Sequence, residues 1–198
     1  MNFGILMVQG LVNSFGKTVM AAFAAAVKID SFAYMPVQDF GNAFSTFIAQ
    51  NYGAQNEERI RRGIKSAVGT AFVFCVVISV VVCVFARPLM GLFIQPEETE
   101  IIAVGVGYLR IEASCYFGIG LLFLLYGFYR AVKRPGMSVV LTVISLGTRV
   151  ALAYALSAVP AVGVTGIWAA VPIGWALADL AGVGYYWKNQ THLLHRKA

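Results

Sequence analysis

Six apolar segments follow one another along the chain, and short polar connections separate them. All but the first are long enough to cross the hydrocarbon core of a bilayer as helices, which takes about 20 residues at about 1.5 Å each. A lone strand in lipid would leave its backbone hydrogen-bonding groups unsatisfied, so helices are expected even where β-branched residues are frequent. The pattern predicts an all-α transmembrane bundle of six helices, over Asn2–Phe15, Thr18–Gln50, Ser66–Ala86, Ile101–Tyr129, Met137–Leu156 and Ala161–Trp187.

Three features predict deviations from straight spanning helices. Asn2–Phe15 is short by about a turn or more, as expected of a truncated helix. Thr18–Gln50 would be roughly 50 Å long as one helix, so we expect it to tilt, to kink at Pro36 or to extend beyond the membrane. We also expect Arg87-Pro88 to end the third helix, because a residue before proline avoids the helical conformation.

A row of small residues recurs at every fourth position in the last segment, which places these residues on one helix face. Such a row lets neighbouring helices approach closely, and Pro172 beside it is expected to bend the helix. The row predicts a tight contact between helices and consists of Gly166, Ala170, Gly174, Ala178 and Gly182.

Composition and charge place the whole chain in a membrane. Of its 198 residues, 59% are hydrophobic and 12% are charged, which is about half the charged fraction of a soluble domain. The net charge of +6 does not indicate a nucleic-acid partner, because the basic residues lie mainly in the connections and the tail. Ten of them fall on one side of the predicted bundle and two on the other, which predicts that both termini are cytoplasmic. We expect a bundle over residues 1–187 and a basic cytoplasmic tail over 188–198, in a bacterial-type plasma membrane.

Common catalytic and cofactor sites find no support in the sequence. Cys75, Cys83 and Cys115 lie inside apolar segments at spacings that fit neither a zinc site nor a disulfide framework. Gly16-Lys17-Thr18 resembles the end of a phosphate-binding loop, but Leu11 stands where that loop needs glycine. We therefore expect neither an enzyme nor a metal or cofactor site.

Seven ionisable residues lie within the predicted spans, where each costs about 2.5 to 3.5 kcal/mol at a helix centre. Such residues are expected to pair with one another or to line a functional path. The positions of Lys28 and Asp30 near the middle of the second helix favour function, whereas Asp39 is left open between the two roles. The other four form two candidate buried ion pairs, also left open: Arg110 with Glu112, and Arg149 with Asp179.

Five short stretches, in order along the chain, carry a family resemblance. They are Gly16–Ala26, Lys28–Met35, Gln50-Asn51-Tyr52-Gly53-Ala54, Tyr108-Leu109-Arg110-Ile111 and Tyr129-Arg130-Ala131-Val132-Lys133-Arg134-Pro135. Together they resemble the second half of the multidrug and toxic compound extrusion (MATE) transporters, over nearly the whole chain. The resemblance implies one of two six-helix lobes, related by a pseudo-two-fold axis, that exchange drugs or metabolites for sodium or protons through a cavity between them.

The resemblance also implies where a coupling acid belongs. In the sodium-coupled branch of the family, the second lobe carries carboxylates on its first helix and in the inner half of its fourth. Here Met1–Gly16 and Ala113–Tyr129 hold no acid, and Glu112 lies about two turns from the implied position. The chain thus resembles more closely the branch whose coupling acid lies in the N-terminal lobe.

The leading hypothesis is the C-terminal lobe of a proton- or sodium-coupled multidrug antiporter, which needs an N-terminal lobe, sits in lipid and carries small organic cations. Phe32, Tyr34 and Phe40 suit flat organic cations, although they also suit core packing. The alternatives are a non-transporting membrane subunit or gene remnant, and a lipid-linked precursor flippase of related fold. Candidates for the cavity or the ion path are Lys28, Asp30, Gln38, Asp39 and Gln9.

Overall fold

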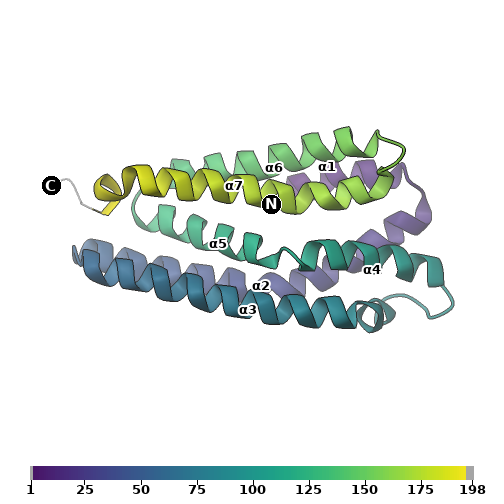
Figure 1. The fold of residues 1–198 in the computed structure, drawn as a ribbon, viewed down its shortest axis with the longest axis horizontal. Helices are drawn as coiled ribbons and strands as arrows, with labels where there is room; N and C mark the ends of the chain where they lie inside the picture. The colour runs from purple at the N-terminus through teal and green to yellow at the C-terminus, as the bar shows by residue number, and fades with distance from the viewer. Residues whose placement is uncertain (1, 195–198) are drawn as a thin grey trace.

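The computed structural model describes residues 2–194, and the described part of the chain is a bundle of helices without strands (Figure 1). The helices lie roughly parallel to one long axis, with α1, α6 and α7 along one side, α2 and α3 along the other, and α5 between them. Their bounds are α1 Asn2–Asn13, α2 Lys17–Gly53, α3 Glu57–Gly91, α4 Thr99–Ala113, α5 Tyr116–Ala131, α6 Pro135–Ser157 and α7 Gly163–Leu194.

The six predicted segments are confirmed as helical, with different ends. The prediction that Arg87-Pro88 ends the third helix is wrong, because α3 continues through Pro88 to Gly91. Pro88 lies in the last turn, where the helix loses one backbone hydrogen bond rather than its whole continuation. Helix α2 is likewise continuous across Pro36, and α7 runs through Leu194, beyond the predicted start of the tail.

The predicted fourth segment is two helices rather than one. Helices α4 and α5 meet at Ser114 and Cys115 with a bend of 52°, and together they form one broken span. Four further helices, α2, α3, α6 and α7, are each long and apolar enough to cross a membrane. Helix α1, with 12 residues, is shorter than a full span.

The basic connections gather at one end of the bundle. The turn between α2 and α3, the turn between α5 and α6, and the end of α7 all lie at the left in Figure 1. The connections from α3 to α4 and from α6 to α7 lie at the opposite end. Helix order alone therefore separates the strongly basic connections from the others.

Two close helix contacts hold the bundle together. Helix α7 packs along α6 through the predicted row of small residues, where a Cβ on Gly174 would lie 2.7 Å from the carbonyl oxygen of Ser145. Helix α5 crosses α2 equally closely, because a Cβ on Gly127 would lie 2.6 Å from the carbonyl oxygen of Gly41. Ser45 on α2 donates a hydrogen bond of 2.9 Å to the Gly127 carbonyl at this crossing.

A long apolar surface covers the outer side of α3 and α6. A row of valines and phenylalanines on α3 is exposed, and valines on α6 are exposed in the same way. A soluble protein rarely exposes so large an apolar area, whereas lipid covers such a surface without cost. The chain is therefore an integral membrane protein. The exposed side chains on α3 include Phe72, Val73, Val76, Val77, Val80, Val81, Val84 and Phe85.

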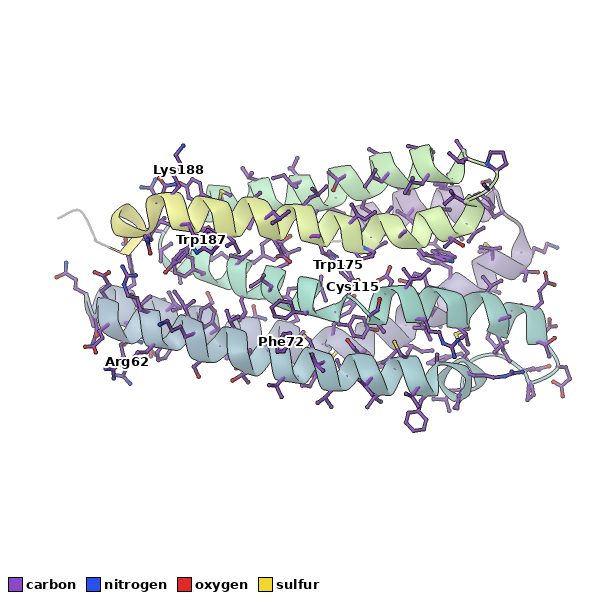
Figure 2. The ribbon with its side chains drawn as sticks, viewed as in Figure 1. Arg62, Phe72, Cys115, Trp175, Trp187 and Lys188 are labelled. Carbon is purple, nitrogen blue, oxygen red and sulfur yellow. The ribbon has the colours of Figure 1, made fainter. Side chains whose placement is uncertain are left out.

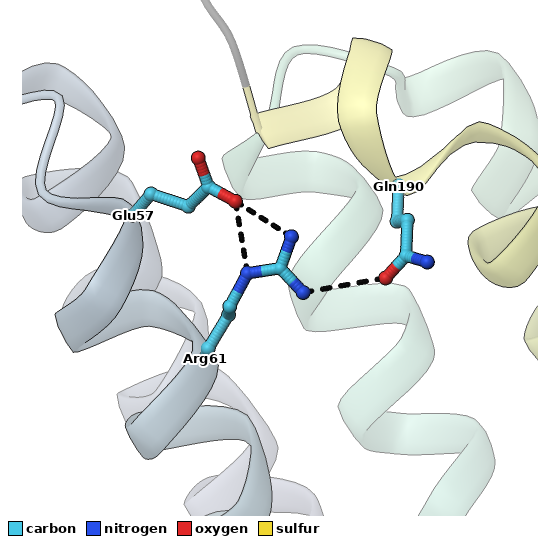
Figure 3. Close-up of polar contacts among 3 residues, drawn as sticks. All are labelled: Glu57, Arg61 and Gln190. Atoms are coloured by element: carbon cyan, nitrogen blue, oxygen red, sulfur yellow. Dashed lines mark hydrogen bonds and ion pairs between the residues drawn. The ribbon is translucent and has the colours of Figure 1, made fainter.

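A polar link ties the end of α7 to the start of α3 (Figure 3). The Arg61 guanidinium contacts the Glu57 carboxylate at 2.6 Å and donates a hydrogen bond of 3.3 Å to the Gln190 side chain. Arg62 pairs with Glu58, and both of these side chains are largely exposed. Arg61 therefore joins two helices that are far apart in sequence.

Candidate functional site

A cavity of about 180 Å³ lies inside the bundle, and side chains from α1, α2, α4, α5, α6 and α7 line it. Three of its lining residues, Asp30, Glu112 and Arg149, are charged at neutral pH. The volume has room for several water molecules or a small ion. The remaining lining residues are Val8, Phe23, Val27, Tyr34, Tyr108, Ile119, Leu122, Phe123, Tyr126, Thr142, Ser145, Leu146, Val171 and Trp175.

Asp30 is held on the inner face of α2 and is 2% exposed. The Tyr116 hydroxyl, in the first turn of α5, donates a hydrogen bond to its Oδ1 atom. Its Oδ2 atom is buried without a hydrogen-bond partner among the described residues. A buried carboxylate with one unsatisfied oxygen is costly, so the site is suited to receive a proton or a cation at that oxygen.

Glu112 ends α4 beside the break and is 3% exposed. Its Oε1 atom, like Asp30 Oδ2, has no hydrogen-bond partner in the described part of the chain. The side chains of Asp30 and Tyr108 lie close enough to Glu112 to affect its charge. Because α5 begins only a few residues later, the positive end of its helix dipole also lies near the two carboxyl groups.

Arg149 supplies the positive charge of the cavity from α6. Its charge acts on both Asp30 and Glu112, yet neither carboxylate lies within ion-pair distance of it. Its Nε atom is buried and has no hydrogen-bond partner among residues 2–194. Arg149 therefore shares the cavity with the two carboxyl groups without forming an ion pair to either of them.

The two ion pairs considered from the sequence are not formed among the described residues. Arg110 is exposed while Glu112 is buried, because residues two apart on a helix point about 200° away from each other. Asp179 on α7 is 8% exposed and does not line the cavity. A Cβ on Gly118 would lie 3.7 Å from its Oδ2 atom, so Asp179 packs against α5. Its Oδ1 atom has no partner in the described structure.

The other candidate residues lie outside the cavity. Lys28 is exposed, and its ammonium lies 5.8 Å from the centre of the Phe93 ring, on a different side of α2 from Asp30. Asp39 and Gln38 are exposed and Gln9 is half-buried. The structure therefore brings Asp30 together with Glu112 and Arg149 rather than with Lys28.

A second cavity, of about 310 Å³, adjoins the first toward the basic end of the bundle. Gln38, Asn42 and Arg130 line it, and Arg130 donates a hydrogen bond of 3.1 Å to the Asn42 side chain. The two cavities share Phe123, Tyr126 and Thr142 as lining residues. These three side chains are the boundary between the buried carboxyl groups and the more open polar cavity.

Two tyrosines near the carboxyl pair, Tyr108 and Tyr116, were not among the site residues predicted from the sequence. Tyr108 and Glu112, four residues apart, lie on one face of α4, and Tyr116 follows beyond the break, in the first turn of α5; all three are buried. Tyr108 packs edge-on against Phe23 and Trp168. Among the three aromatic candidates, Tyr34 lines the cavity, Phe40 is half-buried and Phe32 is exposed.

Trp175 lies on the α7 side of the cavity, facing the break between α4 and α5 where Cys115 lies (Figure 2). A Cβ on Gly118, in the first turns of α5, would lie 3.5 Å from the Trp175 Cβ. No group of three or more His, Cys, Asp or Glu side chains suited to a metal ion occurs among the described residues.

Comparisons with known proteins agree with this architecture. The MatE family model matches residues 1–155. Probable multidrug resistance protein YoeA of Bacillus subtilis is 26% identical over 190 residues, covering 92% of this chain and 40% of that protein. YpnP of the same organism, also a probable multidrug resistance protein, is 31% identical over 142 residues, covering 72% and 32%. An FAD transporter of Shewanella oneidensis is 25% identical over 177 residues, covering 88% and 38%.

Solved structures show the same fold at low sequence identity. A transporter of the MOP superfamily from Pyrococcus furiosus matches with a TM-score of 0.91 and 18% identity, over 99% of this chain and 44% of that one. An inward-facing multidrug resistance MATE family transporter matches with a TM-score of 0.89 and 18% identity, over 99% and 45%. An outward-facing one matches with a TM-score of 0.89 and 19% identity, over 97% and 43%. The chain spans about two fifths of the length of the curated relatives that cover most of it.

Proposed function

Because the chain belongs to the MatE family, we propose that it acts as the C-terminal lobe of a cation-coupled multidrug efflux antiporter. Members of the family are transporters and not enzymes. The chain spans less than half of each similar transporter, so a preceding lobe completes the transport path in this proposal. The basic connections at one end of the bundle support an orientation with both termini in the cytoplasm of a bacterial cell.

One observation carries the proposal: two carboxyl groups, each with an unpartnered oxygen, share a buried cavity inside the lobe. Ionisable residues inside a membrane are expensive, and a site that keeps two of them uses them for ions or protons. The sequence alone favoured a coupling acid in the other lobe. The juxtaposition of Asp30 and Glu112 supports a site within this chain, with either proton or sodium as the coupling ion.

In this proposal, ion binding is coupled to movement of the lobes because the site without an ion holds unfavourable, uncompensated negative charge. Binding of an ion at Asp30 and Glu112 removes uncompensated negative charge from the lobe and so favours the arrangement of lobes in which the site is filled. Binding of the drug in the cavity between the lobes favours the other arrangement. Alternation between the two arrangements then exports the drug. The equal TM-scores against inward- and outward-facing transporters support a lobe that keeps its fold while it moves.

The substrates are proposed to be small organic molecules, with flat organic cations as one class among them. Two similar curated proteins are named as probable multidrug resistance proteins, and a third is named as an FAD transporter. Lys28 and Phe32 are exposed on α2, and Gln38 lines the second cavity, toward the basic end of the bundle. These side chains are the candidates for the lobe's share of the substrate path.

Dye efflux from proteoliposomes tests the proposal. We expect the chain alone to give no efflux driven by a proton or sodium gradient, and the chain with an N-terminal lobe to give it. Efflux by the isolated chain would contradict the half-transporter, and no efflux in either case would favour a non-transporting subunit. Separate proton and sodium gradients identify the coupling ion.

Substitutions test the ion site in the complete transporter. Asp30→Asn and Glu112→Gln are each expected to reduce the rate of gradient-driven efflux by about tenfold or more, which corresponds to a rise of roughly 1.4 kcal/mol in the activation free energy of the transport cycle. Asp179→Asn is the matched control, because Asp179 is also a buried carboxyl group but lies outside the cavity. Unchanged efflux in Asp30→Asn would remove the cavity from the coupling mechanism.

A further inference from the structure

The charges that line the buried cavity can be counted, and we infer that Arg149 limits the cavity to a single added positive charge. The inference rests on the proposed function, since it takes this cavity to be the ion site. In it, Arg149 is a specificity-determining residue: it admits a proton or a monovalent cation and excludes divalent cations.

The lining supplies two carboxylates and one guanidinium. Asp30 and Glu112 are both more than nine-tenths buried and each keeps an unpartnered oxygen. Arg149 lines the same cavity and has a buried, unpartnered Nε. Arg149 makes no ion pair within 4 Å of either carboxylate in the described structure, and all three groups line the same cavity of about 180 Å³, which has room for a small ion. With all three groups ionised, the cavity carries a net charge of −1.

Other charged groups do not alter this count. Lys28 and Arg110 are exposed on outward sides of α2 and α4. Asp179 packs behind α5, against Gly118, and does not line the cavity. Tyr108 and the other tyrosines in the lining are neutral hydrogen-bond donors at ordinary pH. One added positive charge therefore neutralises the cavity.

The electrostatic effect of Arg149 is large enough to decide selectivity. A unit charge about 10 Å from an ion, at an effective dielectric constant of about 20, changes monovalent affinity roughly 15-fold and divalent affinity by roughly the square of that factor. Arg149 therefore weakens divalent binding far more than monovalent binding. Removing its charge leaves a net charge of −2, which suits one divalent cation.

The prediction is a gain of function in Arg149→Gln. The purified chain, in lipid nanodiscs with sodium replaced by a large organic cation, is titrated with CaCl₂ while tryptophan fluorescence is recorded. Trp175 lines the cavity and is the reporter, and Trp175→Phe identifies its share of the signal. We expect Arg149→Gln to bind Ca²⁺ at least about tenfold more tightly than the unsubstituted chain. Arg149→Lys, which keeps the charge, and Asp179→Asn are expected to match the unsubstituted chain.

Double substitutions show whether the gain in Ca²⁺ affinity of Arg149→Gln arises at the cavity. The gain is expected to disappear when Asp30→Asn or Glu112→Gln is added to Arg149→Gln. The pair Glu112→Gln with Arg149→Gln restores a net charge of −1, so it should regain the response to Na⁺ or to pH that Glu112→Gln alone loses. A merely structural role of Arg149 would give no such rescue. Arg149→Met makes the same charge change and replaces Arg149→Gln if circular dichroism shows that the latter is misfolded.

The outcomes separate this inference from the proposed function. If Asp30→Asn leaves efflux and the ion response of the chain intact, the proposed function fails. If both depend on Asp30 and Glu112 but Arg149→Gln and Arg149→Met gain no Ca²⁺ affinity, this inference alone fails. A gain that persists without Asp30 also overturns it, because the Ca²⁺ then binds elsewhere.

Discussion

Gly174 on α7 provides a direct measure of how closely α6 and α7 approach. A Cβ at this position would lie 2.7 Å from the carbonyl oxygen of Ser145 and 3.4 Å from the Thr148 hydroxyl oxygen. Ordinary contacts of a Cβ begin at 3.4 Å, so Gly174→Ala requires the two helices to separate by about 0.7 Å at this point. The obstacle is backbone and cannot rotate away.

The expected cost follows from two opposing terms. Overpacking of a close contact costs about 1 to 3 kcal/mol, and alanine in place of glycine in a helix interior contributes about 0.5 to 1 kcal/mol of stability. We expect a net destabilisation of roughly 0 to 2.5 kcal/mol for Gly174→Ala. Gly184→Ala on the same helix meets nothing within 4 Å, so only the favourable term applies there.

Reversible unfolding in mixed micelles, followed by circular dichroism, measures both variants. The free energy of unfolding should be lower in Gly174→Ala than in Gly184→Ala by about 1 to 3 kcal/mol, because the favourable alanine term is common to both variants. Equal stability of the two variants would refute the reasoning, because it would mean that α6 and α7 are not in backbone contact at Gly174. The separation should also displace Arg149, which lies one turn from Ser145 on α6.

Two further predictions concern single polar contacts. Tyr116→Phe removes the hydrogen-bond donor to Asp30 and is expected to lower the free energy of unfolding by about 1 to 3 kcal/mol. Tyr34→Phe, in the cavity lining, should lower it less, because the Tyr34 hydroxyl makes only a 3.4 Å contact with Ser31. Equal losses of stability in the two variants would argue against a special role for the Tyr116 hydrogen bond. Arg61→Gln should raise the rate of amide hydrogen exchange near Gln190, with a loss of stability below about 1 kcal/mol. Arg62→Gln should leave that exchange rate unchanged, because the partner of Arg62 is Glu58. The same exchange rate in both variants would show that the link in Figure 3 does not hold the end of α7.

The sequence predicts most of the helices because lipid leaves the backbone few alternatives. Apolar length predicts the spanning helices, and the four-residue period of small side chains predicts the α6–α7 contact that Gly174 makes. Hydropathy does not predict the break between α4 and α5, because the break falls at Ser114 and Cys115, where neither a proline nor a glycine marks it. The break depends on what the two half-helices pack against.

Charged residues that are close in the sequence do not lie together at the site. Lys28 and Asp30 are two residues apart, as are Arg110 and Glu112, and in a helix this spacing separates side chains by about 200°. One member of each pair is buried and the other exposed. The informative spacing was the interval of four between Tyr108 and Glu112 on α4, but nothing local in the sequence indicates that Tyr116, beyond the break, or Asp30, on another helix, completes the group.

The bend between α4 and α5 has a consequence for how the chain enters the bilayer during synthesis. The two half-helices have 15 and 16 residues, about 23 and 24 Å of helix, while the hydrocarbon layer is about 30 Å thick. Neither half can settle across the bilayer by itself, and α4 also carries Arg110 and Glu112. The translocon must therefore release the two half-helices together. Glu112 is shielded from the acyl chains only after α2 has been inserted. Biogenesis of this span depends on the helices made before it.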